Sequence, residues 1–331
     1  MSETASHTPH ILIPFAAASS DDCQRHLSQL ELPHLRQLRH KLTLVEADTG
    51  ADDTFSPPHE RAWAKALGLM TAESFVDGYI PWAAHAADQM GLATDASDSA
   101  AWGWVSLCNY FVGTGSMTLE DPAQLHITEA ESRQLLKDMQ PYFAEDGITL
   151  HYVDPTRWLA CGEPLQSIPT ASLDRVVGRN LDAWQPEGAP AARLRRLQNE
   201  MQMLLYTHTV NDARSRAKSA AINSIWLHGT GELPAVGTRV SANITAPRGL
   251  ADAALREDWA AWAQAWQQLD ATVCADLLKR LQAGESVTLT LCGERSALTY
   301  ALRPKSAWEQ LKLKSRGVLG LQPAYLLPKQ L

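Results

Sequence analysis

The 331-residue sequence lacks any apolar run close to the roughly 20 residues that a helix needs to cross a bilayer. Its first ten residues, MSETASHTPH, are polar and lack the basic and apolar regions of a secretory signal. The five cysteines are odd in number, widely spaced and never arranged as CxxC, which disfavours both a disulfide framework and a zinc site. We therefore expect a cytoplasmic protein with reduced thiols and no membrane partner.

An excess of positive charge is also absent. The chain has 29 Lys and Arg against 37 Asp and Glu, a net charge of -8, which disfavours general binding to nucleic acid or to anionic membranes. A local basic pocket is compatible with this total. The composition, 45% hydrophobic and 20% charged, is that of a globular protein, and the length suits one large domain or two of ordinary size.

Familiar catalytic signatures are missing as well. No GxSxG elbow supports a serine nucleophile, and no HxxxH or DxH spacing surrounds His34, His40 or His59. A two-metal hydrolase needs several Asp and His ligands on loops that follow strands. The acidic pairs at 21–22 and 52–53 are candidates, but solvated loop charge explains each pair equally well.

What the sequence does contain is an alternation of strand and helix patterns. Strands are expected at 10–14, 42–45, 102–112, 148–153, 222–227, 286–291 and 297–302, and the last two are expected to pair with each other. Helices are expected at 21–40 with a break at Pro33, and at 59–69, 128–143, 191–205 and 251–283. Thr128 and Glu131 match a capping box at the start of one of these helices. This order predicts an α/β protein.

The stretch INSIWLHGTGELP, residues 222–234, joins an apolar strand to a Gly229-Thr230-Gly231 turn. A nest of backbone N–H groups there could bind a phosphate, although the turn is neither GxGxxG nor a P-loop. Arg214 and Arg216 lie shortly before the strand, and the arginine fork suits phosphate oxygens. The alternative is a simple strand-ending turn preceded by a solvated charged loop, and both interpretations stay open on spacing alone.

Tryptophan is unusually abundant, with 11 residues. Trp259, Trp262 and Trp266 recur at steps of three and four, which places them along one side of a helix. Such a stripe is either core packing or a set of exposed anchors for a protein partner.

Three segments carry a resemblance to a known family. They are YIPWAAHAADQMGL (79–92), the stretch from WVSLCNYFVGTGS to ESRQLL (104–136), and NDARSRAKSAAINSIWLHGTGELP (211–234). LPHLRQL (32–38) and FSPPHERAWAKALGL (55–69) match more weakly. With these segments the chain resembles the archaeal-type cofactor-independent, or 2,3-bisphosphoglycerate-independent, phosphoglycerate mutases of the alkaline-phosphatase superfamily. It looks closest to a bacterial branch labelled RpfE-type regulatory protein.

The resemblance implies a fold with two domains. An alkaline-phosphatase-like α/β domain, with a mixed or parallel sheet flanked by helices, would be formed by residues 1–75 together with 235–331. A smaller α+β substrate-type domain, residues 76–234, would be inserted between these two parts.

The residues that the family uses for catalysis are replaced in this chain. The family has Asp-Gly after its first strand, where this sequence has Pro14-Phe15. It has a Ser or Thr nucleophile before Pro-Asn, where this sequence has Leu32 before Pro33. The later Asp and His ligand motifs correspond to 258–270 and 291–300, and the phosphate-binding arginine is absent from 121–127. Two-metal phosphoryl transfer needs these ligands, so we expect no catalytic residue and no metal ligand.

We therefore expect a non-catalytic binding or regulatory protein, a pseudoenzyme without a cofactor, whose partner is a small phosphorylated metabolite. The ligand site is expected near Arg214, Arg216, His228, Gly229 and Gly231. One alternative is an active metal-dependent phosphoglycerate mutase or phosphatase that uses two Mn or Mg ions. A second alternative is a protein-interaction scaffold; no particular protein partner is indicated.

Overall fold

The computed structural model describes residues 8–71, 73–92, 101–113, 115–166, 168–234 and 243–302. These residues divide into two compact units. Unit 1 contains 8–52, 58–66 and 243–302, and unit 2 contains 53–57 and 67–234. The chain therefore leaves unit 1, returns to it for one helix, and leaves it again before the last part completes its sheet.

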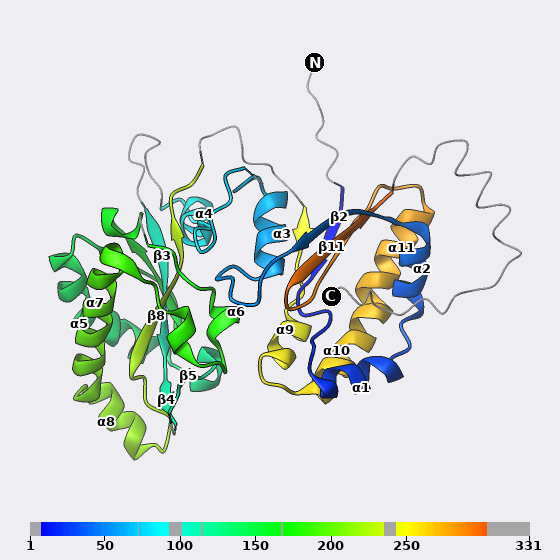
Figure 1. Cartoon of the computed structure of the whole chain (residues 1–331). Helices are drawn as coiled ribbons and strands as arrows, with labels where there is room; N and C mark the ends of the chain where they lie inside the picture. The colour runs from blue at the N-terminus through cyan, green and yellow to red at the C-terminus, as the bar shows by residue number, and fades with distance from the viewer. Residues whose placement is uncertain are drawn as a thin grey trace, which may run out of the picture. The chain divides into compact units, whose positions relative to one another are not determined.

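Unit 1 is built on a five-stranded mixed sheet with the order β2-β11-β10-β1-β9 (Figure 1). The strands are β1 (His10–Ile13), β2 (Thr43–Thr49), β9 (Ile244–Thr245), β10 (Thr288–Cys292) and β11 (Ser296–Ala301). Strand β1 runs parallel to β9 and β10, whereas β11 is antiparallel to both of its neighbours. The predicted pairing of 286–291 with 297–302 and the predicted α/β class, with a mixed sheet flanked by helices, are confirmed.

Helices cover both faces of the unit 1 sheet. They are α1 (Asp21–Gln29), α2 (Pro33–Lys41), α3 (Pro58–Ala66), α9 (Gly249–Ala254), α10 (Trp259–Leu269) and α11 (Ala275–Gln282), with a π-helical segment, Asp270–Cys274, between the last two. Adjacent residues of a strand point to opposite faces. Ile13 accordingly packs with α1, α2, α10 and α11, and Leu12 packs with α3.

Unit 2 contains a four-stranded antiparallel sheet with the order β6-β7-β3-β8. Its strands are β3 (Trp102–Cys108), β6 (Thr149–Asp154), β7 (Arg157–Cys161) and β8 (Ser224–Gly231). A separate hairpin is formed by β4 (Tyr110–Val112) and β5 (Met117–Leu119). The single strand expected at 102–112 is therefore two strands, interrupted at Asn109.

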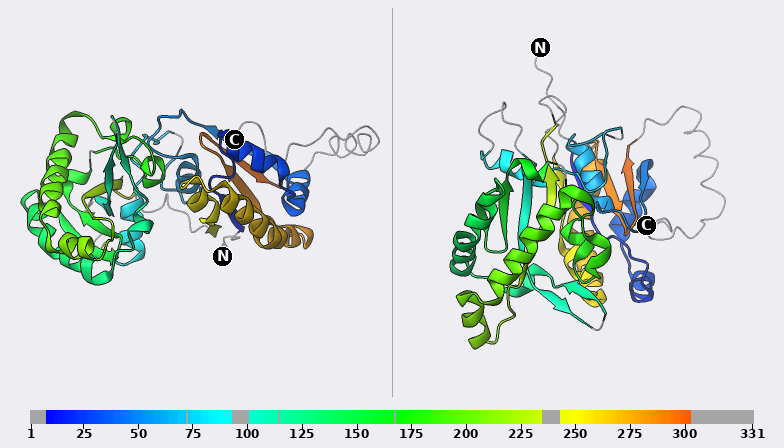
Figure 2. Two further views of the ribbon diagram at one scale, coloured as in Figure 1. Left: turned by 90° about the horizontal axis from the view of Figure 1, so that it is seen from below. Right: turned by 60° about the vertical axis from the view of Figure 1, so that its left-hand side comes forward.

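The two faces of the unit 2 sheet have different coverings. Its helices are α4 (Trp82–Gln89), α5 (Glu129–Glu145), α6 (Leu173–Val176), α7 (Gly188–Tyr206) and α8 (Thr209–Arg216), with 3₁₀ turns at Pro122–Leu125, Glu163–Leu165 and Leu181–Trp184. Helices α5 and α7 bury the face that carries Val105 and Trp158 (Figures 1 and 2). Helix α4 packs on part of the opposite face, against Trp102 and Trp104.

Local sequence signals explain where several of these helices begin. The capping box is confirmed: the Thr128 hydroxyl accepts from the backbone N–H of Glu131, whose carboxylate accepts from the backbone N–H of Thr128. Pro33 occupies the first turn of α2, where a missing N–H costs nothing. None of the described helices is both long enough and apolar enough to span a membrane.

Candidate functional site: a polar patch on the sheet of unit 2

Arg214, the first residue of the expected anion site, is a structural residue. Its side chain is buried and donates three hydrogen bonds, to the carbonyls of Ala220 (2.7 Å) and Leu125 (2.5 Å) and to the carboxylate of Glu131 (3.0 Å). A guanidinium held in this way joins the end of α8 to the start of α5. It has no exposed edge to offer a ligand, because it is itself buried.

The other residues of the expected site do not meet Arg214. Arg216 is exposed at the last position of α8, which lies before the first residue of β8. Gly229 and Gly231 lie towards the opposite end of this eight-residue strand, about 17 and 23 Å from its first residue at a rise of about 3.3 Å per residue. The structure therefore corrects the expectation of one pocket that unites the arginines with the glycines.

The glycine segment itself is a bulged end of β8. The pairing of β3 with β8 shifts between Trp102 and Trp104, and Gly229 has a φ of 60°. A Cβ atom added to Gly229 would lie 3.0 Å from the Cβ of Trp82. Glycine is therefore required here by a left-handed backbone and by the close approach of α4, and no phosphate cradle is needed to explain it.

His228, the remaining residue of that set, belongs to a different group of side chains. Residues that face each other in an antiparallel sheet point to the same side. Trp104 is paired with His228, and Ser106 is paired with both Trp226 and Arg157. The Oγ of Ser106 lies 3.0 Å from Nε2 of His228.

Arg157 completes this group. Its guanidinium carbon lies 4.6 Å from the centroid of the Trp104 ring, and its Nε donates to the carboxylate of Asp154 at 2.7 Å. We call Trp104, Ser106, Arg157 and His228 the Arg157–His228 site. It lies on the sheet face opposite α5 and α7.

The electrostatics of the site keep His228 neutral. Burial and the nearby charge of Arg157 lower the pKa of His228 to about 4, against a smaller opposing effect of Asp174. Burial alone would raise the pKa of Asp154, but hydrogen bonds from Thr156 and Arg157 outweigh it and the pKa is lowered. At neutral pH the site thus contains one arginine cation, a neutral imidazole and an ionised Asp154.

This arrangement suits binding better than nucleophilic catalysis. A serine beside a histidine resembles a nucleophile with its general base, but that chemistry needs an imidazole that readily accepts a proton. In the serine triad a carboxylate stabilises the imidazolium, whereas here a guanidinium destabilises it. His228 is therefore a poor base and a serviceable hydrogen-bonding partner.

Sequence reasoning missed Ser106 and Arg157. The alternation in WGWVS and SIWLH could have placed Trp104 with Ser106, and Trp226 with His228, on one face of each strand. It could not reveal that β3 lies between β7 and β8, because these strands are separated by long stretches of chain.

Unit 2 also has a small hollow next to its 67–81 segment. It has a volume of about 200 Å³ and is lined mostly by apolar side chains, with Tyr79 and Glu232 among the polar contributions. Pockets for small molecules usually measure about 300–1,000 Å³. The hollow is below this range, so we base no functional assignment on it.

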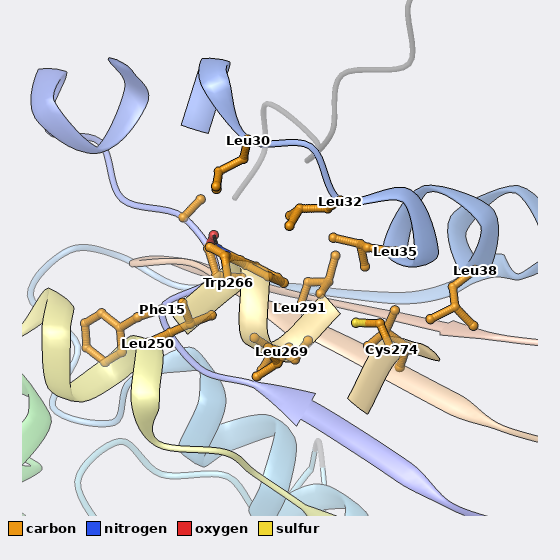
Figure 3. Packing of buried hydrophobic residues seen from close by; sticks show 14 of the residues in the cluster. Phe15, Leu30, Leu32, Leu35, Leu38, Leu250, Trp266, Leu269, Cys274 and Leu291 are labelled. Atoms are coloured by element: carbon orange, nitrogen blue, oxygen red, sulfur yellow. Dashed lines mark hydrogen bonds between the residues drawn. The ribbon is translucent and has the colours of Figure 1, made fainter. Parts of the chain in front are cut away.

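In unit 1, the positions that the resemblance matches to the family's catalytic residues are packed into an apolar core. Leu32 is fully buried before α2, in the same cluster as Phe15, Trp266 and Leu291 (Figure 3). The indole N–H of Trp262 donates to the carbonyl of Phe15 at 2.9 Å. This hydrogen bond from Trp262 holds the segment after β1 in place.

Asp270, the acidic residue at the end of the 258–270 stretch, has a structural role. Its carboxylate accepts from the backbone N–H groups of His34 (3.2 Å) and Leu35 (2.7 Å), and it lies 2.9 Å from Nδ1 of His34. It thereby caps α2 from another helix, since Leu32 at the N-cap position has no side chain able to do so. The π-helical segment that begins at Asp270 shifts the helix register at this point.

These positions do not fit the two Mn or Mg ions that the family resemblance implies. Such ions bind carboxylate and other oxygen ligands, and imidazole in the case of transition metals. The side chains of Leu32 and Phe15 have no atom that could bind a metal ion, and the Asp270 carboxylate already accepts two backbone hydrogen bonds. No catalytic step through metal ions at these positions follows from this structure.

The tryptophan stripe is part of the same core. Trp262 and Trp266 are fully buried, and Trp259 is partly buried against them, with adjacent rings edge to face at 6.0 and 6.3 Å. This corrects the hypothesis that the stripe is a set of exposed anchors for a protein partner.

Comparison with known proteins identifies one similar class. No family model matches the chain. A probable 2,3-bisphosphoglycerate-independent phosphoglycerate mutase of Geobacter sulfurreducens is 28% identical over 179 residues, which are 50% of this chain and 43% of that protein. The chain thus spans less than half the length of this relative. The sequence match supports a relationship to the cofactor-independent phosphoglycerate mutases, whereas the RpfE-type branch stays a prediction.

Two solved structures are also similar. A cofactor-independent phosphoglycerate mutase from Thermoplasma acidophilum aligns over 90% of this chain and 91% of its own, at 12% identity and a TM-score of 0.34. A Pyrococcus horikoshii protein aligns over 92% of both chains, at 12% identity and a TM-score of 0.46.

Proposed function

We propose that the protein is a non-catalytic binding or regulatory relative of the cofactor-independent phosphoglycerate mutases, and that it binds a small phosphorylated metabolite. One observation carries the non-catalytic part. At the position where the resemblance expects a nucleophile, Leu32 is fully buried in the core of unit 1. A leucine cannot attack phosphorus, and its burial leaves no room for a substrate at this point.

The packing around Leu32 strengthens this interpretation. Phe15 follows β1 where a metal ligand is expected, and its carbonyl is held by the indole of Trp262. Ionised ligands and a metal would have to enter a region of closely packed apolar side chains, which is costly unless every charge is paired. The surroundings of Leu32 are thus those of a hydrophobic core.

The test is an assay combined with elemental analysis. The purified full chain is incubated with 3-phosphoglycerate in the presence of Mn²⁺ or Mg²⁺, and the formation of 2-phosphoglycerate is followed by ³¹P NMR. We expect no interconversion, together with saturable binding of 3-phosphoglycerate by calorimetry. Metal-dependent interconversion would overturn the non-catalytic proposal, and a lack of any binding would overturn the binding proposal.

The second candidate is an active metal-dependent phosphoglycerate mutase or phosphatase. The sequence match to the Geobacter protein favours it. The arrangements of unit 1 residues described above do not. Copurification of two equivalents of manganese, with turnover, would support it.

A cytoplasmic location is also part of the proposal. All five cysteines are free thiols, and four of them are buried. Unpaired cysteines are typical of proteins from reducing compartments. Retention of full solubility and fold in excess dithiothreitol is the expected behaviour.

A further inference from the structure

We propose that the Arg157–His228 site of unit 2 binds the acidic group and an adjacent hydroxyl of the ligand. The inference rests on the proposed binding function and places it at named atoms. The chemical class is a small hydroxy acid that carries one phosphate or carboxylate within reach of Arg157. This location differs from the Arg214 region that the sequence suggested.

Arg157 has an exposed edge suited to an anion. Its side chain is 48% exposed, and its only hydrogen-bonding guanidinium nitrogen among the described residues is Nε, which donates to Asp154. The two terminal nitrogens are therefore available to bind a phosphate or carboxylate in a bidentate manner. The Trp104 ring below the guanidinium and the Asp154 carboxylate beside it fix its orientation in advance.

The His228 and Ser106 pair supplies neutral hydrogen-bonding groups on the same sheet face, where Ser106 is paired directly across from Arg157. One ring nitrogen of His228 is engaged with Ser106, so the other nitrogen takes the complementary role and can accept from or donate to a ligand hydroxyl. His228 is only partly buried, whereas Ser106 is 2% exposed. The histidine is thus the member of the pair that a ligand can reach, and Ser106 positions its ring.

The charges around the site limit the kind of ligand. Arg157 is the cation that lies over Trp104, and its charge is partly compensated by Asp154, with Asp174 also acting on His228. A ligand that presents one acidic group to Arg157 and a free hydroxyl to His228 matches this balance, whereas 2,3-bisphosphoglycerate has no free hydroxyl and brings a second phosphate towards the Asp154 carboxylate. We therefore expect 3-phosphoglycerate to bind more tightly than 2,3-bisphosphoglycerate.

The chain offers a matched control on the opposite face of the same sheet. Arg133 of α5 lies over the Tyr152 ring at 3.8 Å, and its Nε donates to Glu129 at 2.7 Å. This arginine has the same stacking and the same kind of carboxylate partner as Arg157. Its place on the α5 side of the sheet separates it from His228 and Ser106.

The experiment measures binding of 3-phosphoglycerate, glycerate and inorganic phosphate to the full chain by isothermal titration calorimetry. Arg157→Ala is expected to raise the Kd for 3-phosphoglycerate about 10- to 100-fold, because a hydrogen-bonded charged contact contributes about 1.5–3 kcal/mol. Arg157→Lys should recover part of this loss, and Arg133→Ala should leave the Kd within about twofold, in line with a surface substitution away from the ligand. Glycerate and inorganic phosphate identify which acidic group is bound.

A second readout is measured on the wild-type protein, and a variant is needed only to assign the signal. In the wild-type protein, the imidazole resonances of His228, assigned with His228→Gln, should shift as 3-phosphoglycerate is added. Unchanged resonances together with an unchanged Kd for Arg157→Ala would refute this placement while leaving the binding function intact. If the wild-type protein binds none of the three probes, the proposed function fails first, and the placement fails with it.

Discussion

The replacement Arg214→Ala distinguishes a structural arginine from a ligand-binding one. The wild-type side chain is buried and satisfies the carbonyls of Leu125 and Ala220 as well as the Glu131 carboxylate. Alanine would leave two carbonyls and one carboxylate without these donors. It would also weaken the start of α5, because Glu131 is the capping-box residue of that helix.

The magnitude follows from the degree of burial. Removing one partner of a buried ion pair costs about 3–5 kcal/mol. Glu131 retains 23% of its side-chain exposure, so water partly replaces the lost guanidinium, and we take the lower end, about 3 kcal/mol. For a unit of about 150–250 residues this corresponds to a decrease in Tm of roughly 6–12 °C.

The assay is urea unfolding of the full chain, monitored by tryptophan fluorescence and by circular dichroism, because a chain with two units need not unfold in a single step. Arg216→Ala is the matched control: Arg216 is exposed on the same helix, so its replacement should change the free energy of unfolding by less than about 0.5 kcal/mol. Suppose instead that Arg214→Ala costs under about 1 kcal/mol and abolishes binding of 3-phosphoglycerate. The structural assignment of Arg214 would then be refuted, and the anion site expected from the sequence would be supported.

Three further outcomes are expected. Leu32→Ser should lower stability by about 2–5 kcal/mol through loss of buried apolar volume and should produce no mutase activity; ³¹P NMR turnover by this variant would contradict our interpretation of unit 1. Gly229→Ala should lower the Tm more than Gly91→Ala does. Both glycines have positive φ, but of the two only Gly229 has neighbours within 4 Å of an added Cβ. Equal decreases in Tm would show that the approach of α4 does not matter. Burial would raise the pKa of Glu131, but hydrogen bonds from Thr128 and from its arginine partner lower this pKa overall. The stability that Glu131 contributes is therefore present above about pH 4.5 and is lost as pH falls through its folded-state pKa. Glu131→Gln should remove this loss of stability at acid pH in urea titrations at pH 3–6, and an unchanged pH dependence would contradict the assignment.

Signals confined to a few neighbouring residues predicted the local structure well. Thr128 and Glu131 fixed the beginning of α5, and Pro33 separated α1 from α2. The alternating run that became β10 and the following strand β11 were placed, and paired, correctly. Each of these features depends on backbone hydrogen bonding within one element or between adjacent elements, and for that reason it could be predicted from the sequence.

Contacts between distant parts of the chain were not predictable in the same way. The glycines of β8 look like a loop motif, yet they permit a bulged strand to approach α4. Arg214 looks like part of an exposed basic loop, yet three acceptors from separate segments surround it. A charged side chain has the same sequence signature whether it is solvated or buried, because its partners are chosen by the fold.

The sequence by itself determined the α/β class and the order of most elements, since periodicity is a property of the chain, and it placed Leu32 where the family resemblance implies a nucleophile. Only the tertiary structure decided that Leu32 lies in an apolar core, that Asp270 caps α2, and that Arg157 and His228 share one sheet face. These features depend on which strands become neighbours and on which face each side chain occupies. Both are settled by the packing of the whole unit, where burial of apolar surface selects one arrangement among many compatible with the local pattern.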